Sequence, residues 1–125
     1  MSDTESIKQN LLSAPWRKYK DITVEGLSGE VTLVIRRPPD KEVLSLFESS
    51  QRDGLIDKAG NPTSPDAGLR FRARVVARCV FLPNATRPLL TEEETLQWPA
   101  LGEVANDCMA ALAPPGAAVE KLKGN

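Results

Sequence analysis

Two runs of alternating apolar and polar residues constrain the fold of this chain most. They are residues 22–24 (ITV) and residues 31–35 (VTLVI), joined by a connection that contains two glycines. A period of two with β-branched side chains is typical of strands. Pro38 and Pro39 end the second strand, because proline cannot donate to a ladder. The sequence therefore predicts a β-hairpin over residues 20–37.

A hairpin of two strands is only marginally stable in water. It must therefore lie on helices or pair with another chain. An edge strand at residues 31–35 would also allow a homo-oligomer built by strand pairing.

Apolar residues at helical spacing predict four helices after the hairpin. They are expected at about residues 41–51, 65–80, 91–98 and 99–113. Asp40 is expected to cap the first of them, and Ser64 followed by Pro65 is a typical start for the second. The intervening segment "RDGLIDKAGNPTSPDAG" is rich in Gly, Pro, Asn and Asp and is expected to be a mobile loop.

The length of 125 residues suits one domain. We expect a single α+β domain over residues 20–113, predominantly helical with about four to five helices and an N-terminal β-hairpin. Residues 1–19 are expected to be flexible or a short helix, and residues 114–125 a flexible tail.

Three consecutive acids, Glu92 to Glu94, could be a chemical site or a helix start. Adjacent helical side chains point about 100° apart, so these carboxylates would not converge on one ion or atom. Thr91 and Glu94 match the capping box, in which each side chain bonds the other residue's backbone amide. The capping interpretation is therefore favoured.

A basic side is expected on the helix at 65–80. Arg70, Arg74 and Arg78 are spaced at i, i+4 and i+8, and Arg72 lies nearby. One interpretation is a contact with phosphate or RNA, which would make the chain a small nucleic-acid-binding or regulatory module. The other is a solvated face paired with acids, and a net charge of −1 favours it.

The composition argues against catalysis and metal binding. The chain has no histidine, which is the commonest general base and metal ligand. Cys79 and Cys108 lie far apart in sequence inside apolar helical patterns, so we expect them to be small core residues. We predict no catalytic residue, no metal and no cofactor.

The N-terminus lacks the features of a signal peptide, and no apolar run approaches a membrane span. We therefore expect a cytoplasmic protein. Trp16 and Trp98 could anchor an interface or fill gaps in the core. The candidate partner-binding residues are Trp16, Trp98, Leu101, Arg70, Arg74 and Arg78.

Three segments carry a resemblance to a known family. They are "VTLVIRRPPDKEVLSL", the arginine-rich "RFRARVVARCV" and "FLPNATRPLLTEEETLQWPALGEVANDCMAAL". In this order they resemble the tail assembly chaperones of long-tailed bacteriophages and prophage-like elements. The likeness spans roughly residues 30–112.

This resemblance implies a binding role without catalysis. Such chaperones coat the tape-measure protein and help to recruit tail-tube subunits, the major tail protein. The implied partners are therefore proteins, and the implied location is the cytoplasm of the host cell.

Overall fold

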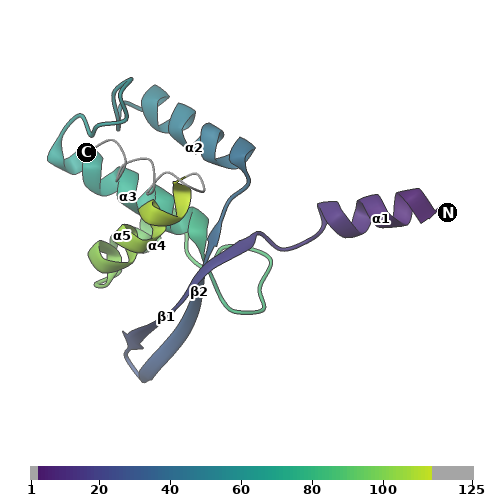
Figure 1. The fold of residues 1–125 in the computed structure, drawn as a ribbon. Coiled ribbons are helices and arrows are strands. Elements are labelled where there is room, and N and C mark those ends of the chain that lie inside the picture. The colour runs from purple at the N-terminus through teal and green to yellow at the C-terminus, as the bar shows by residue number, and fades with distance from the viewer. Residues whose placement is uncertain (1–2, 114–125) are drawn as a thin grey trace, which may run out of the picture.

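The computed structural model of the chain describes residues 3–113. Within them the chain forms five helices and a three-stranded antiparallel sheet with the order β1-β2-β3 (Figure 1). The elements are α1 (Asp3–Leu12), β1 (Arg17–Gly26), β2 (Gly29–Arg37), α2 (Asp40–Arg52), α3 (Pro65–Cys79), β3 (Val80–Phe81), α4 (Glu92–Leu96) and α5 (Leu101–Leu112). This confirms the predicted helix-rich α+β class with an N-terminal hairpin. The tail predicted at 114–125 lies outside the described residues.

The hairpin of β1 and β2 is longer than predicted. Its first strand begins at Arg17 rather than at residue 20, because Arg17 pairs with Arg37 beyond the apolar run. Ladder bonds are made by the backbone and need no apolar side chain. At the tip, Gly29 has a φ of 121°, a conformation that favours glycine. The register shifts between Lys18 and Lys20, where the chain inserts a bulge.

The sequence did not predict strand β3, because the helix expected at residues 65–80 ran through Val80. The helix instead ends at Cys79, and Val80 and Phe81 pair with Ile35 and Val34 of β2. β2 is therefore the central strand at Val34 and Ile35, where the expected edge is covered by β3, whereas within the described part of the chain residues 31–33 pair with β1 alone. Helical spacing could not show this, because the pairing joins residues far apart in sequence.

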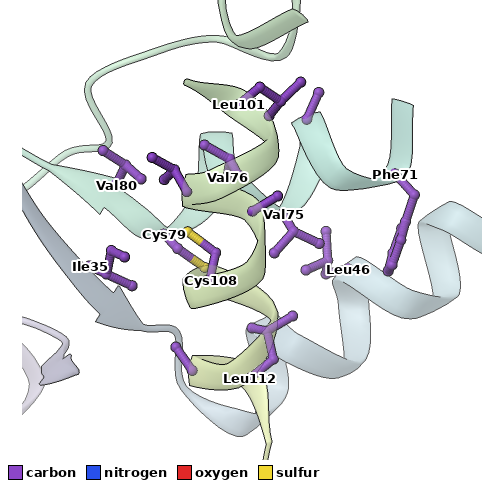
Figure 2. Close-up of a cluster of buried hydrophobic side chains, with 14 of the residues drawn as sticks. Ile35, Leu46, Phe71, Val75, Val76, Cys79, Val80, Leu101, Cys108 and Leu112 are labelled. Atoms are coloured by element: carbon purple, nitrogen blue, oxygen red, sulfur yellow. The ribbon is translucent and has the colours of Figure 1, made fainter. Parts of the chain in front are cut away.

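The core lies between the sheet and helices α2, α3 and α5 (Figure 2). Leu33 and Ile35 of β2 point into it, and α3 packs on α4 and α5. The buried core residues are Leu33, Ile35, Leu46, Ile56, Phe71, Ala73, Val75, Val76, Cys79, Val80, Leu101, Val104, Ala105, Cys108, Ala111 and Leu112. Together these side chains form one continuous cluster.

Two of the three expected helix caps are present. The Ser64 side chain accepts from the Ala67 amide at 3.0 Å, with Pro65 as the first helical residue. Asp40, by contrast, does not cap α2. Pro39 holds the cap position without a side-chain bond, and Asp40 forms an ion pair with Arg37 at 2.9 Å.

Helix α4 starts with the predicted capping box. The Glu94 amide donates to Thr91 Oγ1 at 3.1 Å, and the Thr91 amide donates to Glu94 Oε1 at 3.0 Å. The helix ends at Leu96, before the predicted residue 98, and α5 starts at Leu101 rather than at residue 99. Pro99 accounts for the gap, since it disfavours helical backbone in the residue before it.

The loop between α2 and α3 is more organised than its composition suggests. Asp57 Oδ1 accepts from the amides of Ala59 and Asn61 at 2.9 Å each. Ile56 forms an isolated bridge with Pro62 and is buried in the core. The expectation of a mobile loop overlooked this internal bonding and the apolar anchor at Ile56.

Replacing Thr91 by alanine tests the cap. The substitution removes the acceptor for the Glu94 amide and should lower the free energy of unfolding by about 1 kcal/mol. Urea unfolding followed by circular dichroism measures the change. Thr86→Ala, at an exposed threonine outside the helix, should have little effect. Equal losses in the two variants would contradict the capping account.

Candidate functional site

The arginines of α3 are engaged in ion pairs within the chain. Arg70 binds Asp66 one turn away at 3.1 Å, and Arg78 binds Glu42 of α2 at 3.3 Å. Arg72 is exposed and pairs with no acid among residues 3–113. The structure thus agrees with a face that is largely paired with acids, and Arg72 is the member of the set without an acidic partner in the described range.

Arg74 holds three helices together. Its guanidinium binds Asp53 at the end of α2 at 2.9 Å and Glu92 at the start of α4 at 3.0 Å. It also donates weakly to Ser49 and Ser50, at 3.4 and 3.5 Å. Its side chain is only 14% exposed. Two carboxylates already pair with this cation, and the pairs link α3 to the end of α2 and the start of α4.

The three consecutive acids, Glu92 to Glu94, each have a different environment. Glu92 binds Arg74, Glu94 closes the capping box, and Glu93 lines a hollow of about 270 Å³ beside Arg74. Within residues 3–113, no three His, Cys, Asp or Glu side chains gather closely enough to hold a metal ion. The triplet is therefore a helix start with one interhelical ion pair.

Trp16 fastens the N-terminal segment to the outer face of the sheet. Its ring lies edge-on to Phe81 of β3, with the centroids 5.7 Å apart. Arg36 donates to the Trp16 carbonyl at 2.8 Å, and its guanidinium lies 5.9 Å from the Phe81 ring. Trp16 is half-buried and performs an internal packing role.

Leu101 and Trp98 occupy different environments. Leu101 is 5% exposed and belongs to the core, which corrects its assignment as a partner contact. Trp98 is half-buried and packs against the core from the turn between α4 and α5. Neither tryptophan stands free on the surface.

Cys79 and Cys108 are both buried, as predicted, and their sulfurs lie side by side between α3 and α5 (Figure 2). The hydrogen bond with Cys79, together with burial, raises the pKa of the Cys108 thiol well above its usual range. Low dielectric disfavours the thiolate, which is the reactive form. The pair therefore behaves as core.

The feature of the body best suited to binding is an apolar groove between α2 and α5, which we call the α2–α5 groove. It encloses about 460 Å³. Its lining residues are Val43, Leu44, Phe47, Met109, Leu112 and Ala113, with Arg37 and Asp40 at the rim. Leu44 is 59% exposed and Met109 is 37% exposed, so apolar surface faces solvent here. Exposed apolar surface with a polar rim is typical of protein-binding sites.

Phe47 shapes the floor of this groove. Its ring packs on Phe71 of α3, with centroids 5.7 Å apart, and it is only partly buried. One side of the ring thus completes the core while the ring also lines the groove. The floor is held by the same contacts that hold the domain together.

Comparison of the chain with protein-family models, curated proteins and solved structures finds no match. Among the described residues, no helix has the length and apolar character needed to cross a membrane. The chemistry of the surface is therefore the basis for assigning a function.

The groove was missed in the sequence because its residues come from two distant helices. The sequence predicts one helix over residues 41–51 and another over residues 99–113, and nothing in it relates the apolar face of one to that of the other. A signal did exist, since Met109 lies off the stripe that buries α5. Only the packing of α2 near α5 joins these positions.

Arg74→Met tests the role of the central ion pairs. It would leave Asp53 and Glu92 without their shared cation, and we expect a loss of about 1–2 kcal/mol in unfolding free energy. The loss should shrink at high salt, which screens the wild-type pairs. Arg72→Met is the matched control and should be nearly neutral. Equal effects of the two variants would contradict the linking role.

The cysteine pair can be tested with Ellman's reagent. Both thiols should react slowly in the native protein and fully after denaturation, because burial shields the two sulfurs from the reagent. Leu27→Cys, at the exposed hairpin tip, provides a positive control that should react at once. Rapid reaction of Cys79 or Cys108 in the native state would contradict their core role.

Proposed function

We propose that this chain is a non-catalytic tail assembly chaperone, which binds apolar helical segments of a tape-measure protein in the α2–α5 groove. The observation that carries the proposal is the groove itself. It is an apolar surface with polar residues at its edge, and its lining residue Phe47 packs on Phe71 of the core. Recruitment of tail-tube subunits and action in the cytoplasm of the host cell are parts of the same proposal.

The chemistry of the groove favours an amphipathic helix as its occupant. Leu44 and Met109 approach from two helices and leave a hollow between them, as in helix-in-groove recognition. Asp40, whose side chain is 93% exposed beside its partner Arg37, can accept hydrogen bonds from polar groups beside the apolar stripe of a client. A tape-measure protein, as a long helical client, would offer many such stripes.

The alternative, a nucleic-acid or regulatory module using the helix at 70–78, has weaker support. Arg70, Arg74 and Arg78 are each held by at least one carboxylate. Binding phosphate there would first require breaking those pairs. The net charge of −1 supplies little general attraction for a polyanion.

Co-expression with the tape-measure protein of the same gene cluster tests the proposal. We expect the chain to keep that protein soluble and to elute with it as a complex. Leu44→Asp should weaken the complex at least about tenfold, because it places a charge in the apolar groove. Leu27→Asp, at the exposed hairpin tip, is the matched control and should leave binding unchanged.

Two results would overturn the proposal. One is a tape-measure protein that stays equally insoluble with and without the chain. The other is a complex that Leu44→Asp and Leu27→Asp affect equally, since binding would then not involve the groove.

A further inference from the structure

Helix α1 projects away from the body of the molecule and none of its residues is buried (Figure 1). Its apolar side chains face solvent: Ile7 is 59% exposed, Leu11 70% and Leu12 81%. Ile7 and Leu11 are one turn apart and share a face, with Leu12 adjoining. A helix of ten residues is marginal in water without tertiary packing. α1 therefore carries an apolar face that needs a partner surface.

The root of α1 is short and stiff. Helical bonding continues through Ser13 and Ala14, whose amides donate to the carbonyls of Gln9 and Leu11 at 3.0 and 3.4 Å. Pro15 follows, and proline restricts both its own φ and the residue before it. Trp16 is then fixed by Arg36 and Phe81. Together these contacts hold α1 directed away from the helices and the sheet of its own chain (Figure 1).

The crevice at this root adjoins the α2–α5 groove. Leu11, Leu12 and Pro15 line a crevice together with Arg37 and Pro38. Arg37 also lines the rim of the α2–α5 groove. An incoming α1 from another molecule would thus run beside the root of the resident α1. This arrangement suits a two-fold axis, at which each chain gives and receives the same element.

Charge has little part in that arrangement. The first turn of α1 carries Asp3 and Glu5. The first turn of α2 carries Asp40 and Glu42 beside Lys41, and Arg37 at the groove is already paired with Asp40 at 2.9 Å. The contact would therefore rest on apolar burial.

The other route to a dimer, pairing through the sheet edge, is poorly supported. The outer strand β1 carries Arg17, Lys18 and Lys20 and contains the bulge. Lysines and bulges are features that prevent edge-to-edge pairing. The exposed helix is the better candidate for contact between copies.

We propose that two copies of this chain exchange their α1 helices. Ile7, Leu11 and Leu12 of each copy fill the α2–α5 groove of the other, against Leu44, Phe47 and Met109. The exchanged dimer covers the groove until a client helix displaces α1. The inference uses the groove described under Proposed function, but it does not depend on the identity of the client.

Light scattering after size exclusion tests the exchange in the purified full chain. The wild type should be a dimer. Leu11→Asp and Leu44→Asp should each weaken dimerisation at least about tenfold, because each places a charge in the apolar contact. Leu27→Asp should remain a dimer. Unfolding midpoints for all four proteins verify that these exposed substitutions leave the fold intact.

Cross-linking shows which chain supplies the helix. Mixing the single variants Leu11→Cys and Leu44→Cys under mild oxidation should give a covalent heterodimer. Leu27→Cys mixed with Leu44→Cys should give none. The double variant Leu11→Cys with Leu44→Cys should likewise form links between chains.

Three results would overturn the exchange: a monomeric wild type, a dimer that persists in both Leu11→Asp and Leu44→Asp, or a double variant linked only within one chain. Failure of the client proposal is distinguishable from these. Leu11→Asp frees the groove without altering it, so it should bind the client at least as well as wild type. If the Leu11→Asp variant is a monomer but does not bind the tape-measure protein, the proposed client is wrong while the exchange of α1 still stands.

Discussion

Strand β2 is buried on both faces at residues 33–35, and β1, β3 and α5 all pack or pair against it. Leu33 and Ile35 face the core, while Val34 lies on the opposite face with its partner Phe81. Trp16 covers that second face. A hairpin that would be marginal alone is thereby held by helices on one side and by β3 and Trp16 on the other.

The candidate site follows from this burial. Pro38 and Pro39 end β2 and lead directly into α2, while α5 packs against the same strand. Lys20 of β1 adds an ion pair to Asp107 of α5 at 3.2 Å. The two helices that form the α2–α5 groove are thus placed by the sheet. Leu44 of α2 and Met109 of α5 line the groove and remain exposed.

Charge has a mainly internal role in this molecule. Arg74 and Arg78 reach from α3 to acids on neighbouring elements, and Arg74 alone links α2, α3 and α4. Each pair exposed to solvent contributes little by itself, but the half-buried Arg74 network fixes helix positions. The exposed face of α1 and the lining of the α2–α5 groove present apolar surface beside this network of charges.

The sequence by itself determined the local structure. Alternation predicted the hairpin, the prolines its end, and Ser64 and Thr91 the starts of two helices, because these signals act through neighbours in the chain. The tertiary structure decided that Val80 and Phe81 form a strand, that Leu101 is core and that Ile56 anchors a loop. It also decided which acid each arginine binds and brought α2 beside α5 to form the groove. These outcomes depend on contacts between residues far apart in sequence, which no local period or cap can specify.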